Sequence, residues 1–240
     1  MEQTYQRNQI SFIVSDVSIK YGNKNALKNV SLQLIKNGIH GVIGNNGAGK
    51  TTLMKTIIGF IKPDNGTIIF VSDKVSDIAF SPEDPVLYEH LTGTENLNFS
   101  ASVCSRASNK YNSSKFDINW IQDATMLASR MSAGNRKKLS LGMALATDRN
   151  VILLDEPFRG LDPISRYNIK NLLTALKNEK TIFISTHELS FSESLFDEVT
   201  ILHDGAIVFS GPLQCVLGRF SADNLEQAFI NAINNDGFRR

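Results

Sequence analysis

A short run of residues carries side chains of the types and spacing that bind phosphate groups. Residues 44–52 read GNNGAGKTT and match the pattern G-x-x-x-x-G-K-[ST]. Glycines let such a loop wrap tightly with its N–H groups turned inward, while the lysine reaches the β- and γ-phosphates and the next hydroxyl binds Mg²⁺. We therefore predict a site for a nucleoside triphosphate and Mg²⁺, with the metal on Thr51, formed by Gly44, Asn45, Asn46, Gly47, Ala48, Gly49, Lys50, Thr51 and Thr52.

Three further polar residues follow apolar runs that have the character of buried strands. Asp155 and Glu156 come directly after the run 151–154, and His187 comes just after the run 181–185. The C-terminal ends of parallel strands are where α/β sheets place their ligands. We expect Asp155 to hold Mg²⁺, Glu156 to orient the water that attacks the γ-phosphate, and His187 to contact that phosphate. The alternatives are a solvated acidic turn, which the upstream phosphate loop disfavours, and a structural histidine.

A helix start lies between the phosphate loop and the carboxylate pair. Ser132 is a suitable N-cap, and Leu139, Met143 and Ala146 follow it with helical spacing. Many proteins contain such a start. Its position shortly before Asp155 is what makes it informative here.

The phosphate loop has the flanking elements that its motif requires. Residues 39–43 predict a short buried strand, and residues 50–58 predict a helix whose positive N-terminal end lies under the phosphates. Further strands are predicted over 10–14, 31–35, 67–71 and 78–80, with turns at Asn29 and 160–163. A helix is predicted to start at Thr92, with Glu95 closing its capping box. A loop over 102–115 and a short helix over 120–128 complete the predictions.

Two sets of apolar side chains allow two interpretations each. Tyr21 is either a strand-end aromatic half packed on the core or a ring that stacks on adenine. Val86, Leu87 and Tyr88 are either exposed contacts for a partner or part of an internal apolar cluster. Both alternatives stay open from these residues alone.

Composition bounds the class of protein. The 240 residues suit one sizeable α/β domain, and a formal net charge of +1 gives no argument for a nucleic-acid partner. Cys104 and Cys215 lie far apart without a C-x-x-C pattern, which indicates a reducing compartment and no metal framework. No apolar run approaches the ~20 residues of a membrane helix, and the polar start 1–9 predicts no signal peptide.

Taken in order, these motifs resemble the ATP-binding subunit of an ABC transporter over nearly the full length of the chain. Tyr21 is similar to the family's adenine-stacking aromatic residue, the run 151–156 to the Walker B strand, Asp162 to the D-loop aspartate and His187 to the switch histidine. The resemblance is sharpest to stand-alone export ATPases of the drug and bacteriocin-immunity type. It is carried there by 81–97 and 224–229.

The resemblance implies a fold, an activity and partners. The fold is an α/β P-loop NTPase core with a parallel sheet, an antiparallel β subdomain and an inserted helical subdomain. The activity is ATP hydrolysis that powers a separate membrane-spanning permease, with the chain peripheral at the cytoplasmic face of the membrane. Its parts would be 1–82 and 149–215 for the core with its β subdomain, 83–148 for the helical insert with the signature loop, and 216–240 for a C-terminal helical tail.

ABC ATPases work as head-to-tail dimers of identical or different subunits. In such a dimer the helix that begins at Ser132 presents its N-terminal end, with Gly134, to the γ-phosphate bound by the other subunit. Asp162 joins the same nucleotide-binding set by its match to the D-loop. ATP would then hold two subunits together, and hydrolysis would release them.

The chain departs from the family at three places. Glu83 stands at the Q-loop glutamine and could still bind Mg²⁺ through a carboxylate oxygen, at the cost of negative charge beside the triphosphate. The signature loop reads MSAGN over 131–135, where Ala133 adds a methyl group near phosphate. The bulky pair Phe158 and Arg159 precedes the D-loop glycine. These changes bear on the hydrolysis rate more than on the fold.

Two other functions remain open beside a transporter subunit. A soluble ABC ATPase without a membrane partner, such as one that serves iron–sulfur cluster assembly, would keep every nucleotide motif. A weakly active half of a heterodimer would account for Glu83 and Ala133. A P-loop kinase is disfavoured because nothing in a kinase requires the loop 132–135 just ahead of the carboxylate pair.

Overall fold

The computed structural model describes residues 9–71, 74–104, 121 and 123–237. Its centre is a six-stranded sheet in the order β5-β6-β7-β3-β8-β9, in which neighbouring strands run parallel except for the antiparallel pair β8 and β9. The strands are β3 (Gly38–Ile43), β5 (Ile78–Ser81), β6 (Val151–Asp155), β7 (Thr181–Thr186), β8 (Glu198–His203) and β9 (Ala206–Pro212).

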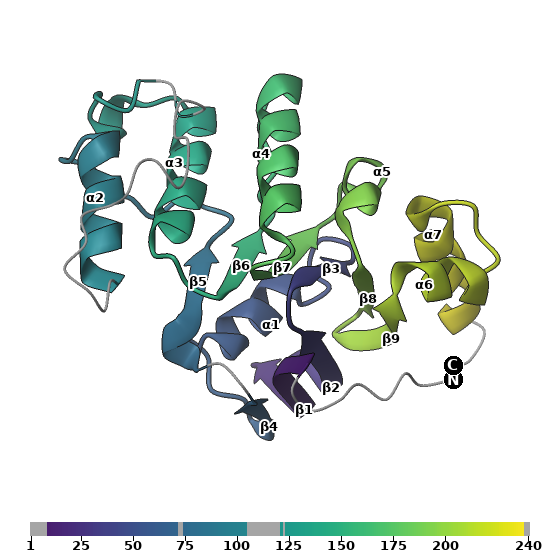
Figure 1. The fold of residues 1–240 in the computed structure, drawn as a ribbon. Coiled ribbons are helices and arrows are strands. Elements are labelled where there is room, and N and C mark those ends of the chain that lie inside the picture. Colours follow the sequence, from purple (N-terminus) through teal and green to yellow (C-terminus); the bar gives the residue numbers. More distant parts are fainter. Residues whose placement is uncertain (1–8, 72–73, 105–120, 122, 238–240) are drawn as a thin grey trace.

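A second, antiparallel sheet has the order β2-β1-β4. It consists of β1 (Ile10–Tyr21), β2 (Lys24–Ile35) and β4 (Asn65–Phe70). The hairpin between β1 and β2 turns at Gly22, whose positive φ of 57° suits a residue without a side chain. This sheet lies below the larger one in Figure 1, with α1 between them.

Apart from α1, the helices fall into three groups (Figure 1). One group, α2 and α3, lies at one end of the molecule; α4 and α5 lie along the large sheet; α6 and α7 pack beside β9 at the other end. The bounds are α1 (Lys50–Ile57), α2 (Gly93–Cys104), α3 (Ala133–Ala146), α4 (Pro163–Leu176), α5 (Leu189–Ser192), α6 (Leu213–Arg219) and α7 (Leu225–Gly237), with short 3₁₀ turns at Val75–Asp77, Ala128–Arg130 and Glu193–Leu195.

The large sheet is buried on both faces, as its continuous apolar strands predict. Successive residues of β6 divide between two apolar clusters. Val151 and Leu153 pack with Leu53 of α1 and with the small sheet, whereas Ile152 and Leu154 pack with helices that include α4 and α7. Because both faces are covered, β6 is held rigidly, and the residues that follow it have fixed positions.

The predicted α/β fold is confirmed, and most predicted elements agree with it to within a residue or two. The predicted capping box is also present: the Thr92 N–H donates to Glu95 Oε2 at 2.7 Å, and the Glu95 N–H donates to Thr92 Oγ1 at 3.2 Å. Among the described residues, no helix has both the length and the apolar character needed to cross a bilayer.

Three local predictions need correction. Asn29 does not turn the chain but lies inside β2 with φ of 49°, where pairing with β1 continues on both sides. The predicted short helix over 120–128 is wrong for its described part, because 123–125 form a turn and a 3₁₀ turn begins only at Ala128. Of the predicted loop 102–115, residues 102–104 end α2 and 105–115 lie outside the described residues.

The apolar set 86–88 divides between the two interpretations. Val86 is exposed, and Leu87 packs against the small cluster that α2 and α3 enclose. Tyr88 is half exposed and lies edge-on to Phe99 of α2, with ring centroids 4.7 Å apart. Part of this loop therefore stays open to a partner, while part anchors it to the helices.

Candidate nucleotide-binding site

The phosphate loop joins β3 to α1, and two of its glycines are sterically required. Gly49 caps α1 with a φ of 107°, and a Cβ added there would lie 2.5 Å from the Ala26 carbonyl oxygen. A Cβ on Gly44 would lie 2.3 Å from the Leu202 carbonyl oxygen. The loop is therefore packed against backbone on its outer side, and the N-terminal end of α1 that follows it is a suitable site for an anion.

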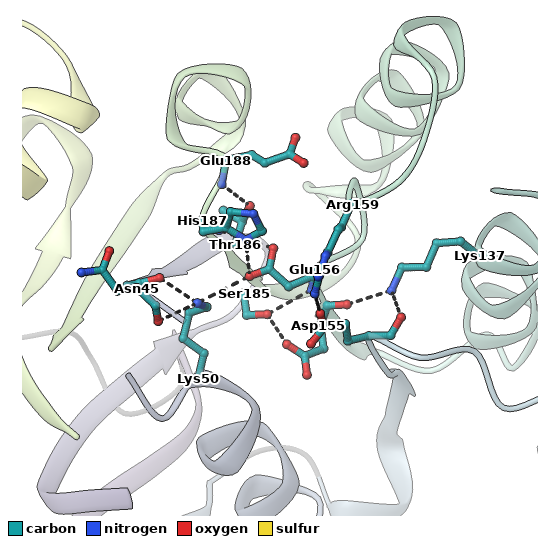
Figure 2. Close-up of polar contacts among 12 residues, drawn as sticks. Asn45, Lys50, Lys137, Asp155, Glu156, Arg159, Ser185, Thr186, His187 and Glu188 are labelled. Atoms are coloured by element: carbon teal, nitrogen blue, oxygen red, sulfur yellow. Dashed lines mark hydrogen bonds and ion pairs between the residues drawn. The ribbon is translucent and has the colours of Figure 1, made fainter. Parts of the chain in front are cut away.

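Lys50 is buried beneath this loop. Its ammonium group donates to the Gly44 carbonyl at 2.7 Å and to the Asn45 carbonyl at 3.3 Å. The same Nζ lies 3.5 Å from Glu156 Oε1, so a cation from the start of α1 meets the carboxylate that follows β6 (Figure 2). The two groups are both only 6% exposed, which strengthens their attraction relative to a surface pair.

His187 completes a cluster around Glu156, and it lies at the edge of the sheet where the sequence placed it. His187 Nδ1 lies 2.9 Å from Glu156 Oε1, and the His187 backbone N–H donates to Oε2 at 3.4 Å. Glu156 adopts a φ of 48°, which is unfavourable for a residue with a side chain and recurs at functional sites. Its backbone N–H is held by both oxygens of Ser185, each at 3.1 Å.

Asp155 has the features of a ligand for a hard cation. Its side chain is buried, Oδ1 accepts a short hydrogen bond from the Ser185 hydroxyl, and Oδ2 has no hydrogen-bond partner among the described residues. An unpartnered buried carboxylate oxygen is costly unless something binds it. The described residues contain no cluster of three or more acidic, His or Cys side chains suited to a metal. The oxygen of Asp155 is the type of ligand that Mg²⁺ takes when one or two protein carboxylates hold it together with substrate phosphates.

A cavity of about 330 Å³ opens above the phosphate loop. It brings together residues predicted from four separate parts of the chain, and Tyr21, at the end of β1, presents a half-exposed ring to it. The lining residues are Tyr21, Lys24, Ala26, Asn46, Gly47, Ala48, Gly49, Lys50, Thr51, Thr52, Glu83, Glu156 and Arg159. Asp155 lines an adjoining cavity of about 670 Å³ together with Thr51 and Glu83, and Asn45 lines a third beside the loop.

Gly44 and His187 are also absent from this lining, and Ser132, Gly134 and Asp162 lie at the starts of α3 and α4 instead. Ser132 caps α3 as expected, with its Oγ accepting from the Asn135 N–H at 3.3 Å. Asp162 caps α4 through the Ser165 N–H at 2.9 Å, and hydrogen bonds from Ser165 lower the pKa of Asp162. Gly134 lies beside the segment that leads to Asp162, because a Cβ on it would be 3.8 Å from Leu161 Cδ2. These residues form a group of their own, away from the loop of the same chain.

Lys137 is a residue that the sequence interpretation missed. Its buried ammonium group donates to three backbone carbonyls: Pro82 at 3.0 Å, Glu83 at 2.7 Å and Asp155 at 3.0 Å. Burial lowers the pKa of Lys137 to about 8, although the charges of Asp155, Glu156 and others oppose the shift. The side chain thus ties α3 to the loop after β5 and to the end of β6. Its position in the signature stretch was the available signal.

Glu83 and Arg159 form an ion pair at the open side of the cavity. The sequence marked both as departures from the family but gave no sign that they meet. Arg159 Nη1 contacts Glu83 Oε1, and the Arg159 backbone N–H donates to the Glu156 carbonyl at 3.3 Å. The carboxylate of Glu83 is thus neutralised by a neighbour that the sequence did not reveal.

Comparison with known proteins identifies the family. The model of the ABC transporter family matches residues 27–159, which is more than half of the chain. The chain belongs to the ABC transporter family. Its fold is that of the family's ATPase domain, and it is similar to a solved ATP-binding subunit of an ABC transporter, with a TM-score of 0.85, 27% identity, and coverage of 93% of this chain and 99% of that one.

Curated proteins that are similar to this chain also belong to ABC transporters by their names. The chain is 34% identical over 206 residues to an uncharacterized ABC transporter ATP-binding protein of Nostoc sp., covering 80% of this chain and 62% of that protein. It is 33% identical to the bacitracin transport ATP-binding protein BcrA of Bacillus licheniformis, covering 81% and 67%. An ABC transporter G family member of Dictyostelium discoideum is 31% identical over 95% of this chain, which spans only 33% of that longer protein.

Proposed function

We propose that this ABC ATPase binds and hydrolyses Mg·ATP to power a separate membrane-spanning subunit that exports its substrate. The observation that carries the proposal is the cluster of Lys50, Glu156 and His187, in which Lys50 and Glu156 line the cavity at the phosphate loop and His187 contacts Glu156. A cation for phosphate, a carboxylate for water and a histidine beside that carboxylate are the groups that γ-phosphate hydrolysis needs.

The bound nucleotide would extend from Tyr21, which contacts its base, to the phosphate loop, which contacts its phosphates. That half-exposed ring stacks on adenine, and the N–H groups of the loop 44–52 surround the phosphates. Lys50 exchanges its carbonyl partners, Gly44 and Asn45, for the β- and γ-phosphate oxygens. The exchange is local because the ammonium group already points into the loop.

Hydrolysis would use the carboxylate edge of the sheet. Asp155, through its unpartnered Oδ2, and Thr51 hold Mg²⁺, with Glu83 at the open side. The ion would neutralise charge on the phosphate oxygens. Glu156 orients and polarises the attacking water, while His187 positions Glu156 and contacts the γ-phosphoryl group.

Ser132, Gly134 and Asp162 would serve the nucleotide of a second subunit. They lie outside the cavity of their own chain, and the N-terminal end of α3 is a suitable site for a phosphate. The proposed unit is therefore a head-to-tail dimer of two ATPase subunits, with ATP between them. The proposed division of the chain is 1–82 and 149–215 for the core, 83–148 for the helical insert and 216–240 for the tail.

The membrane partner would be a permease bound through the loop between β5 and α2. Val86 and Tyr88 are exposed apolar groups in this loop, which also carries Glu83 at the cavity. The chain would then sit peripherally at the cytoplasmic face of the membrane. Export is supported by the similarity to bacitracin transport ATP-binding proteins of Bacillus licheniformis and Enterococcus faecalis.

Purification of the tagged chain from its own membranes tests this proposal. We expect a multi-span membrane protein to co-purify, and we expect Val86→Ser with Tyr88→Ser to release it while basal ATPase activity is kept. ATPase activity with no membrane protein in the complex would instead favour a soluble ABC ATPase.

A weakly active half of a heterodimer is the second candidate. It is favoured by the ion pair that Glu83 and Arg159 place at the cavity and by the methyl group of Ala133 at the signature loop. Co-purification of a second, different ATPase subunit, with turnover restored only when both are mixed, would select it over the homodimer.

A further inference from the structure

The two residues whose types depart most clearly from the family pattern at the nucleotide cavity contact each other. Glu83 follows β5 and Arg159 follows β6, two neighbouring parallel strands whose ends meet at one edge of the sheet. Together they add a carboxylate and a guanidinium to a cavity that already contains Lys50 and Glu156. The cavity thus has a guanidinium group in addition to the ammonium groups of Lys24 and the buried Lys50.

Hydrogen bonds fix the backbones of this pair, whereas the guanidinium end of Arg159 is largely exposed to solvent. The Arg159 N–H donates to the carbonyl of Glu156, and the Glu83 carbonyl accepts from the buried Lys137. The Arg159 side chain is nevertheless 56% exposed and that of Glu83 31%. An exposed ion pair contributes little stability, so exchanging its partner costs little.

A bound triphosphate would compete directly with Glu83 for this guanidinium. The terminal phosphate has three acceptor oxygens and more negative charge than a single carboxylate, and the planar fork of arginine binds such oxygens in pairs. Lys50 enters from the opposite, buried end of the cavity. A cation three residues after Glu156 can therefore reach the phosphate from the open side, where Lys50 does not.

We propose that Arg159 is an ATP-sensing residue, which pairs with Glu83 when no nucleotide is bound and moves to the terminal phosphate when Mg·ATP binds. The transfer frees the Glu83 carboxylate at the same moment. Since ADP lacks the γ-phosphate, Arg159 returns to Glu83 after hydrolysis. This inference rests on the proposed function as an ATPase, and it makes the loop that carries Glu83 respond to whether ATP or ADP is bound.

Equilibrium binding of a non-hydrolysable ATP analogue and of ADP, both with Mg²⁺, tests the proposal without turnover. Arg159→Ala should weaken analogue binding by about tenfold or more, the scale of a charge-assisted hydrogen bond, and ADP binding by less than threefold. Arg159→Lys, which keeps the charge but loses the fork, should fall between. Lys177→Ala is the matched control, because Lys177 pairs with Asp197 at 2.8 Å away from the cavity.

The double variant separates phosphate contact from simple charge screening of Glu83. If Arg159 contacts phosphate, then at saturating Mg²⁺, where the weaker metal ligand does not limit binding, Glu83→Gln alone should bind the analogue at least as well as the unmodified chain, and Arg159→Ala with Glu83→Gln should stay several-fold weaker. If Arg159 only screens Glu83, the double variant will bind the analogue like the unmodified chain, and the proposal is overturned. An equal loss of analogue and ADP binding in Arg159→Ala would also overturn it.

The same titrations distinguish failure of this inference from failure of the proposed function. If the unmodified chain and the Lys177→Ala control bind neither nucleotide, the ATPase function itself is wrong. If both bind tightly and Arg159→Ala matches them for the analogue and ADP alike, only the role of Arg159 is lost. Thermal unfolding of each variant checks that its fold is retained.

Discussion

The buried and open ends of the nucleotide cavity differ in how much freedom their charged groups keep. At the buried end, Lys50 and Glu156 are held by loop carbonyls, by Ser185 and by His187. At the open end, Glu83 and Arg159 have anchored backbones but side chains that are partly exposed. One cavity thus contains both preorganised groups suited to chemistry and solvent-exposed groups suited to sensing the nucleotide.

The largest effect is expected from Glu156→Gln at the buried end. The variant should keep ATP binding but hydrolyse about a hundredfold to ten-thousandfold more slowly, because the amide cannot act as a base toward water. It should also accumulate an ATP-bound dimer. Phosphate release and size-exclusion chromatography measure the two effects. Glu188→Gln is the control, since its carboxylate pairs with Arg166 at 2.6 Å instead; normal turnover in Glu156→Gln would refute the catalytic role.

Lys50→Ala tests the other half of the buried pair. Loss of the ammonium group should weaken ATP binding by about a hundredfold, near the upper limit for a charge-assisted hydrogen bond, and leave the charge of Glu156 without its cation. Isothermal titration with Mg·ATP measures this effect. Lys55→Ala, in the last turn of the same helix, is the control. Unchanged affinity would show that the loop does not bind phosphate as proposed.

Tyr21→Ala probes the entrance of the cavity. Loss of the stacking ring should weaken ATP binding by about 1–3 kcal/mol, while the preference among nucleobases changes little because every base has a flat face. Competition binding with ATP and GTP measures both quantities. Tyr167→Ala removes an exposed ring from α4 as a control. Equal affinities for the variant and the unmodified chain would return Tyr21 to a packing role.

Lys137→Met tests how much the hydrogen bonds from Lys137 to the segments that follow β5 and β6 stabilise the fold. The change leaves three carbonyls without their shared donor and should lower the free energy of unfolding by about 1–3 kcal/mol. Urea unfolding provides the measurement. Lys138→Met is a close control, because Lys138 is equally buried one residue along α3. If both variants unfold at the same urea concentration, the three carbonyls do not depend on Lys137.

The smallest effect is expected from Glu83→Gln at the open end. We predict a modest loss of Mg²⁺ affinity, because an amide oxygen is a weaker ligand, and basal hydrolysis that is unchanged or faster as repulsion of the γ-phosphate is removed. Coupling to the membrane partner should suffer more. ATPase rates against Mg²⁺ concentration, with and without the partner, measure all three. A collapse of basal hydrolysis at saturating Mg²⁺ would contradict this view of Glu83.

Local sequence patterns were enough to predict the parts of the site whose geometry is set by residues close together along the chain. The phosphate loop, the cap at Ser132 and the pair of Asp155 and Glu156 could be predicted because short spacing fixes their local geometry. The fold class followed as well, since buried parallel strands have continuous apolar runs. Element ends were less certain: pairing with β1 carries β2 through Asn29, although asparagine alone suggests a turn.

The contacts between residues that are far apart along the chain became visible only in the tertiary structure. Ser185 leaves one oxygen of Asp155 unpaired, Lys137 gathers carbonyls from two strand ends, and Arg159 meets Glu83. None of these contacts has a local sequence pattern, because each depends on the order of strands in the sheet. Parallel strands bring their C-terminal ends to one edge whatever their separation along the chain, and that edge is where this protein assembles its charges.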